Sequence, residues 1–154
     1  MRSSRGFTIL ELLLALLAVT LVATYSIWAY FSRAEVTLVH AAGLLVDDLR
    51  LAQARAGCLH VPVEVVFHAD SNGYHIAAPD SEGVPTEHHP RSYPSDAVFE
   101  GVHILEKRLP DHGRLVFDER GRLAHDSTIT LGYRGEARTV LVRADGMIVI
   151  ADGP

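Results

Sequence analysis

The chain has 154 residues, of which 14 are basic and 19 acidic, and its formal net charge is −5. Once an N-terminal apolar segment is set aside, this length leaves one small domain, which excludes a large enzyme. The acidic balance disfavours a protein that binds nucleic acid or an anionic surface with its whole face, because net charge sets the long-range field.

An apolar segment from Phe7 to Phe31 dominates the N-terminal part of the sequence. Its 25 residues include one charged residue, Glu11, and Arg2 and Arg5 precede it. About 20 apolar residues suffice to cross a hydrocarbon core of ~30 Å, so the segment predicts a transmembrane helix. Basic residues next to a membrane segment stay on its cytoplasmic side, so Arg2 and Arg5 place the N-terminal end in the cytoplasm. We therefore expect a single pass through the inner membrane, with the C-terminal part outside the cytoplasm, which in a Gram-negative cell is the periplasm.

Glu11 is unusual because a carboxylate at the centre of a bilayer helix costs about 2.5 to 3.5 kcal/mol, and less near the interface. If the chain were cut between Gly6 and Phe7, Phe7 would carry a free α-amine at the same membrane depth as Glu11. A helix packed beside another could offer this amine to its neighbour's carboxylate. The sequence therefore predicts a charge that is neutralised between subunits.

The stretch from Arg5 to Glu11, RGFTILE, resembles the class III signal of type IV pilins and type II secretion pseudopilins. The resemblance implies cleavage by a prepilin peptidase after Gly6, N-methylation of Phe7 and a role of Glu11 in assembly. Residues 1–6 would be the leader. A secretory signal peptide fits less well, since its apolar region is about 7 to 15 residues long. A simple membrane anchor would not need Glu11.

The helical pattern continues beyond the membrane segment. Apolar residues three and four positions apart form one stripe, which predicts a single helix from Phe7 to about Ala56, with Gly57 ending it. The stripe consists of Leu38, Ala42, Leu45, Leu49, Ala52 and Ala56, and the charged residues expected to point elsewhere are Glu35, Asp48, Arg50 and Arg55. At ~1.5 Å per residue this helix would be about 75 Å long. Residues 32–57 are expected to pack on the globular domain.

Residues 58–154 are expected to form a β-rich domain. Val61–Phe67 and Tyr74–Ala77 flank turn residues and predict a hairpin. The proline-rich stretch Ala78–Asp96 is expected to be a long loop, which is typical of functional or mobile segments. The other expected strands are Val102–Leu109, Arg114–Asp118, Arg122–Ala124, Thr128–Tyr133, Thr139–Arg143 and Met147–Ile150. Short strands without helices between them predict an antiparallel sheet or sandwich, so the fold class is α+β.

The helix end at residues 48–56 and the strand pattern of residues 115–122, 138–142 and 145–148 are similar to the GspH/FimT branch of the pilin family. The resemblance covers nearly the whole chain and implies a long N-terminal helix packed on a small β domain. It implies a structural role as the H-type minor pseudopilin of a type II secretion pseudopilus. The alternative is a FimT-like minor pilin that acts in DNA uptake or pilus assembly. Expected partners are other pilins, the prepilin peptidase and the membrane.

Some FimT-like minor pilins bind DNA through basic residues near the C-terminus. The corresponding candidates here are Arg120, Arg122, Arg134, Arg138 and Arg143. Acidic residues interleave with them, so surface ion pairs are the favoured interpretation. The leader holds the basic residues Arg2 and Arg5, and the membrane segment holds the acidic residue Glu11. The rest of the chain therefore has 12 basic and 18 acidic residues, a net charge of −6. DNA binding is therefore disfavoured.

The sequence offers no convincing reactive centre, and we expect neither an enzyme nor a cofactor. The densest group of metal-ligating residues consists of Glu87, His88, His89 and Asp96. Adjacent residues of an extended chain point in opposite directions, so this group predicts no metal site. The serines near histidines are Ser92, Ser95 and Ser127, and none lies in a nucleophile motif. The single cysteine, Cys58, excludes an intrachain disulfide and is expected to be buried.

Overall fold

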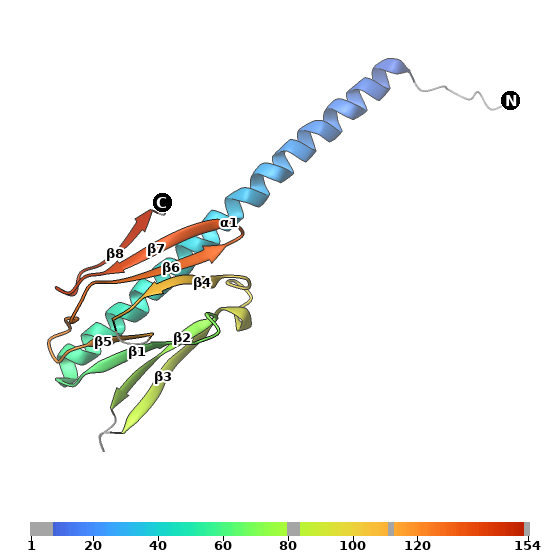
Figure 1. Ribbon diagram of the computed structural model, residues 1–154. Helices are drawn as coiled ribbons and strands as arrows, with labels where there is room; N and C mark the ends of the chain where they lie inside the picture. The colour runs from blue at the N-terminus through green and yellow to red at the C-terminus, as the bar shows by residue number, and fades with distance from the viewer. Residues whose placement is uncertain (1–7, 80–83, 111–112, 153–154) are drawn as a thin grey trace. The chain divides into compact units, whose positions relative to one another are not determined.

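The computed structural model of the protein describes residues 8–79, 84–110 and 113–152. The chain divides into two units, residues 1–34 and residues 35–154. A single helix, α1 (Ile9–Leu59), begins in the first unit and continues into the second (Figure 1). Within the first unit, Ile9–Ser26 is long and apolar enough to cross a membrane, and all of its side chains are exposed.

Eight strands form two antiparallel sheets in the second unit (Figure 1). The strands are β1 (Val63–Phe67), β2 (Gly73–Pro79), β3 (Pro85–Ser92), β4 (His103–Arg108), β5 (Arg114–Phe117), β6 (Ser127–Tyr133), β7 (Glu136–Val142) and β8 (Ile148–Asp152). The first sheet has the order β3-β2-β1-β5, and the second has the order β4-β6-β7-β8. The expected α+β class is thus confirmed. The expected hairpin is present as β1 and β2, with Phe67 opposite Tyr74.

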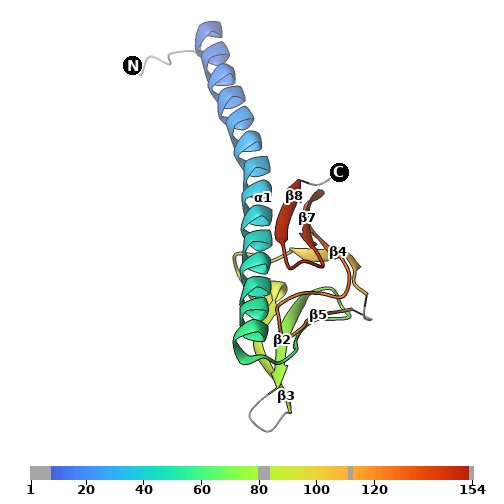
Figure 2. The same cartoon turned by 90° about the vertical axis from the view of Figure 1, so that its left-hand side faces the viewer.

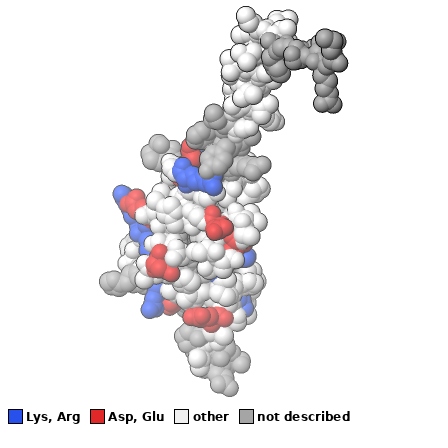
Figure 3. All heavy atoms as spheres, turned by 90° about the vertical axis from the view of Figure 1, so that its right-hand side faces the viewer, with Lys and Arg blue, Asp and Glu red and all other residues white. Residues whose placement is uncertain are grey.

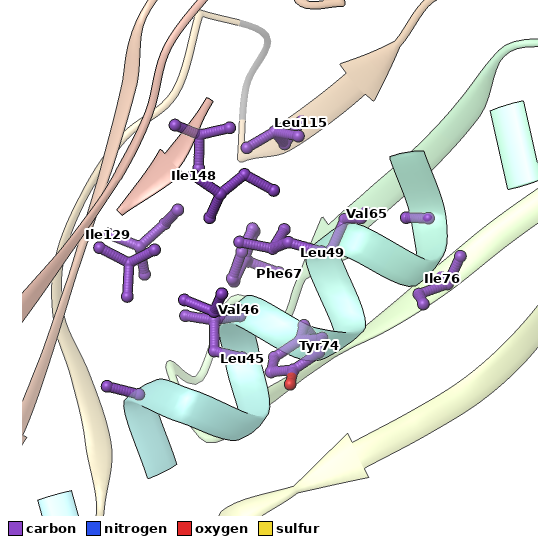
Figure 4. Packing of buried hydrophobic residues seen from close by; sticks show 14 of the residues in the cluster. Leu45, Val46, Leu49, Val65, Phe67, Tyr74, Ile76, Leu115, Ile129 and Ile148 are labelled. Atoms are coloured by element: carbon purple, nitrogen blue, oxygen red, sulfur yellow. The ribbon is translucent and has the colours of Figure 1, made fainter. Parts of the chain in front are cut away.

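The core lies between α1 and the inner faces of both sheets, because alternate residues of β1 and β6 are buried. Figure 2 shows the C-terminal half of α1 beside the strands, and Figure 4 shows where their apolar side chains meet. Leu45 and Leu49 of α1 pack with residues of both sheets in one cluster. The apolar stripe predicted for the helix is confirmed, since all six of its residues are buried. Leu45→Ala would cost about 2 to 5 kcal/mol of stability.

The helix ends later than expected. It continues to Leu59, so Gly57 lies inside the helix and does not cap it. Cys58 is exposed, contrary to the expectation of burial. The buried stripe ends at Ala56, and two further residues turn the side chain by about 200° around the helix axis. The chain leaves the helix at His60, whose φ is 54°.

The expectation of a long loop at Ala78–Asp96 is wrong. The strand β3 and the short 3-10 helix η1 (Tyr93–Ser95) occupy much of this stretch. Prolines disfavour a central strand because they cannot donate a hydrogen bond to the ladder. They are tolerated here because β3 lies at the edge of its sheet and pairs only with β2.

Residues 122–124 form no strand, contrary to expectation. The N–H of Asp118 donates to the carbonyl of Arg122 over 2.8 Å, which closes a turn after β5. The N–H of Leu123 then donates to the carbonyl of Ala144 over 3.2 Å. Leu123 is 7% exposed and belongs to the core. Its apolar character therefore reflects burial in a turn and not a strand.

Gln53 ties α1 to two turns of the domain. Its Nε2 donates to the carbonyl of Gly121 over 2.8 Å and to that of Gly146 over 2.9 Å. Both glycines have positive φ, at 71° and 90°. A Cβ on Gly121 would lie 2.9 Å from the Cγ of Gln53. Glycine is therefore required at Gly121 both by its backbone conformation and by the close approach of Gln53.

Two hydrogen bonds join the sheets at the turn between β1 and β2. The N–H of Ile104 in β4 donates to the carbonyl of Ser71 over 3.0 Å. Lys107, also in β4, donates from Nζ to the carbonyl of His68 over 2.7 Å. The hairpin of the first sheet is therefore held by an edge strand of the second.

Candidate functional site

Glu11 lies in the first turn of α1, where Thr8 caps the helix. The Oγ1 of Thr8 accepts the N–H of Glu11 over 3.2 Å, and its carbonyl accepts the N–H of Leu12 over 3.2 Å. Glu11 is thus the third helical residue, in the T-x-x-E order of a capping box. A carboxylate here also meets the positive end of the helix dipole. This local role was visible in the sequence motif, but the sequence reasoning missed it.

The rest of the predicted processing site is not described. Gly6 and Phe7 lie outside the described residues, so cleavage, methylation and pairing of the new α-amine stay predictions. The side chain of Glu11 is exposed. Among the described residues, no cation lies within ion-pair distance of it.

The five candidate DNA-binding arginines do not gather in one patch. Arg134 precedes β7 and Arg143 follows it, so a strand of roughly 20 Å separates them. Arg138 lies between them on β7 and pairs with Glu35 of α1 over 3.3 Å. Only 20% of the Arg138 side chain is exposed. Its charge is therefore directed to the helix.

Acidic side chains accompany the arginines near the turns. Arg122 lies 4.0 Å from the carboxylate of Asp118, and Arg143 lies 3.8 Å from that of Asp145. The Asp118 carboxylate also accepts the N–H groups of Arg122 and Arg120, and these hydrogen bonds lower its pKa. On the face shown in Figure 3, Lys and Arg are interspersed with Asp and Glu. The geometry thus supports surface ion pairs.

A buried polar cluster joins α1 to the first sheet. Asp48 accepts hydrogen bonds at Oδ2 from the hydroxyl of Tyr74, over 2.9 Å, and from Nε of Arg91, over 2.8 Å. The hydrogen bond to Asp48 raises the pKa of Arg91, and burial raises the pKa of Tyr74. Asp48 is 7% exposed, so the expectation that it points away from the core is wrong. It lies three residues after Leu45, on the same broad face of the helix.

The residues considered for metal binding and catalysis do not converge. In the described ranges, no group of three His, Cys, Asp or Glu residues could hold a metal ion. His88 pairs across the strands with Ile76, and His89 has a positive φ of 50°. The hydroxyls of Ser95 and Ser127 donate to backbone carbonyls and not to an imidazole.

Taken together, α1 and the two sheets that pack on its C-terminal half define a pilin-like fold. No protein-family model matches the sequence, and no curated protein matches it. Solved structures do match. The type IV minor pilin FimU of Pseudomonas aeruginosa is similar with a TM-score of 0.59 and 17% identity, over 74% of this chain and 87% of that chain.

The minor pseudopilin EpsH from the type II secretion system of Vibrio cholerae is similar to the same degree. One EpsH structure has a TM-score of 0.59 and 13% identity, over 75% of this chain and 96% of that chain. Another has a TM-score of 0.60 and 10% identity, over 77% and 95%. At these identities the likeness shows the fold, and it confirms the GspH/FimT-like pilin fold that the sequence resemblance implied.

Proposed function

We propose that this protein is a structural minor subunit of a pilus-like filament, namely a pseudopilin of a type II secretion pseudopilus. The observation that carries the proposal is α1, which joins an exposed apolar segment, Ile9–Ser26, to a stripe that forms the core of a pilin-like domain. Residues 1–6 would be the leader, 7–31 the membrane helix, 32–57 its continuation and 58–154 the β-rich periplasmic domain.

Assembly would depend on charge pairing at the start of α1. Within its own chain the exposed Glu11 carboxylate gains only from the helix N-terminus, because no cation lies within ion-pair distance of it among the described residues. A neighbouring subunit's α-amine at Phe7 would supply one, and attraction between unit charges grows steeply as the dielectric constant falls. Pairing would replace the hydration that each charge loses. The register between adjacent helices would then be set by Glu11 and Phe7.

Substitutions at Glu11 separate this role from helix capping, because Gln also serves at the third position of a capping box. Glu11→Gln removes the charge and keeps a side chain that can complete a capping box, whereas Glu11→Leu removes both; the bond from the N–H of residue 11 to the Oγ1 of Thr8 is kept in either variant. We expect both variants to be inserted and cleaved. Intact mass measures this, and it should show loss of residues 1–6 and one methyl group on Phe7. Both should lose cross-linking to other filament subunits, whereas Asp47→Asn, at an exposed acid of the domain, should assemble normally.

Three outcomes would contradict the proposal. Mature protein that begins at Met1 in cells with an active prepilin peptidase would exclude processing at Gly6. A Glu11→Leu protein that assembles as well as the parent would exclude a pairing role. A Glu11→Gln protein that assembles when Glu11→Leu does not would assign the effect to the helix cap and not to the charge.

A FimT-like minor pilin remains the second candidate, because the likeness to FimU equals the likeness to EpsH, both at a TM-score of 0.59. If this candidate acts by capturing DNA, the protein should cause a salt-dependent shift of duplex DNA. Charge reversal at Arg120 and Arg122 should then abolish the shift. A purely structural subunit with paired arginines should cause no shift at micromolar protein and low salt.

A further inference from the structure

Two histidines face each other nitrogen to nitrogen at the hairpin of β1 and β2. His68 follows β1, and His75 lies in β2 between the buried Tyr74 and Ile76. The Nε2 of His68 is 3.3 Å from the Nδ1 of His75, and the ring planes are tilted by 39°. His75 is therefore on the sheet face that points away from α1, where the apolar core does not need it.

Glu87 of β3, a largely exposed carboxylate, lies on the other side of His75. Its Oε1 lies 3.5 Å from the Nε2 of His75, so it favours a proton on that nitrogen. The Nδ1 of His75 is then a lone-pair acceptor aimed at His68. Histidines that bind metals almost always carry such a carboxylate or carbonyl on the opposite nitrogen, which sets their tautomer and orientation. His75 has this arrangement, with the Glu87 carboxylate beside its Nε2 and with its Nδ1 directed to His68.

The separation of the two nitrogens suits a shared ion. Zn–N bonds are about 2.0 to 2.1 Å long, and a tetrahedral angle between two of them places the nitrogens about 3.3 to 3.4 Å apart. The observed 3.3 Å matches this separation, and a modest rotation of each ring about its χ2 bond would turn both lone pairs from the hydrogen-bond line toward a common point. The backbone is also held in place, because Lys107 donates to the carbonyl of His68 and β1 pairs with β2 on the other side.

We propose that His68 and His75 form a two-nitrogen site for a divalent transition ion of the Zn²⁺ type, with Glu87 as a positioning residue for His75. The described residues offer no third ligand, so water would complete the coordination. The ion would take the place of the hydrogen bond between the two imidazoles, and the proton on the Nε2 of His68 would move through solvent to its Nδ1, so that both rings stay neutral. This site differs from the His88 and His89 pair considered in the sequence, and it does not depend on the proposed filament role.

Calorimetric titration of the intact chain in detergent with Zn²⁺ tests the site. We expect one ion per chain at this site, with Ca²⁺ and Mg²⁺ failing to compete because they prefer oxygen ligands. His68→Ala and His75→Ala should each weaken Zn²⁺ binding at least about tenfold, and Glu87→Gln should weaken it by about tenfold without changing the stoichiometry. His103→Ala and His125→Ala, at exposed histidines elsewhere, should bind as the parent does.

The same samples distinguish coordination from a structural effect. Electron paramagnetic resonance of bound Cu²⁺ should show two imidazole nitrogens in the parent and one in either His variant. His68→Gln at the strand end supplies the second test should His75→Ala fail to fold. Parent protein that binds Zn²⁺ no more tightly than the His68→Ala/His75→Ala double variant would overturn the proposal, as would loss of binding in His103→Ala.

Discussion

At the scale of single residues, two buried tyrosines have hydroxyl groups in different surroundings. The rings of Tyr74 and Tyr93 are packed edge to face with centroids 6.3 Å apart. The hydroxyl of Tyr74 donates to Asp48. The hydroxyl of Tyr93 is buried and has no hydrogen-bond partner within the described part of the chain. The same substitution at the two positions should therefore have different effects.

Tyr74→Phe should lower the free energy of unfolding by about 1 to 2 kcal/mol, because the buried Asp48 carboxylate loses a hydrogen-bond donor. Tyr93→Phe should be neutral or slightly stabilising, since it removes a buried hydroxyl that pays the cost of desolvation without a bond. Urea unfolding of the intact chain in detergent, followed by near-ultraviolet circular dichroism, measures both. Equal losses at the two positions would contradict this account.

The cluster around Asp48 could not be predicted from the sequence. Its partner Arg91 is 43 residues away and lies in a stretch whose prolines favoured a loop. Periodicity does place Asp48 between Leu45 and Ala52 on one face of α1, and a charged residue there is a signal of a buried partner. The residues near Asp48 in the sequence do not identify that partner. The cluster therefore becomes visible only when β3 is seen as a strand.

At the scale of elements, α1 is held by specific contacts as well as by its apolar stripe. The amide of Gln53 serves the turn after β5 and the turn between β7 and β8, which belong to different sheets. One side chain thus fixes the position of both sheets on the helix. The stripe alone would allow the helix to shift along its axis, because apolar contacts have no direction.

Gln53→Ala should cost about 1 to 3 kcal/mol, because two carbonyls lose their donor. Gln53→Glu is the matched control. It keeps the shape of the side chain, but at neutral pH its carboxylate can only accept hydrogen bonds and would face the two carbonyl oxygens. We expect it to be at least as destabilising as Gln53→Ala in the same urea assay. A Gln53→Glu protein as stable as the parent would show that the two hydrogen bonds contribute little.

Helix and strand periods predicted most elements of the domain, and the failures have physical reasons. The stripe from Leu38 to Ala56 follows from a period of 3.6 residues, and β6 follows from a period of two. The helix end was missed because Gly57 is a permitted interior residue as well as a common cap. The strand β3 was missed because prolines exclude central strands but not edges, and the order of strands cannot be read from local sequence.

At the scale of the whole molecule, burial of aromatic hydroxyls makes stability depend on alkaline pH. Burial raises the pKa of both Tyr74 and Tyr93 in the folded protein above the unfolded value of about 10. The unfolded chain therefore releases these protons first as the pH rises. The contribution of the two tyrosines to stability is complete below about pH 10 and is lost progressively above it.

The free energy of unfolding should therefore fall as the pH rises from about 10 to about 12, and more steeply in the parent than in Tyr93→Phe, which has one buried hydroxyl fewer. Urea titrations at several pH values give the slope directly. Parallel slopes for parent and variant would show that Tyr93 ionises alike in both states. The opposite sign, a rise in stability with pH in this range, would contradict the burial of both hydroxyls.

The bond from Lys107 to the carbonyl of His68 has a consequence for chemical labelling. Lys107 is the only lysine in the chain, so the protein presents one ε-amine and one α-amine to an amine-directed reagent. The ε-amine is partly buried and already engaged over 2.7 Å, and acylation would require breaking that bond. Amine-reactive dyes and cross-linkers should therefore modify the globular domain at Lys107 alone, and only where its bond to the carbonyl of His68 has opened.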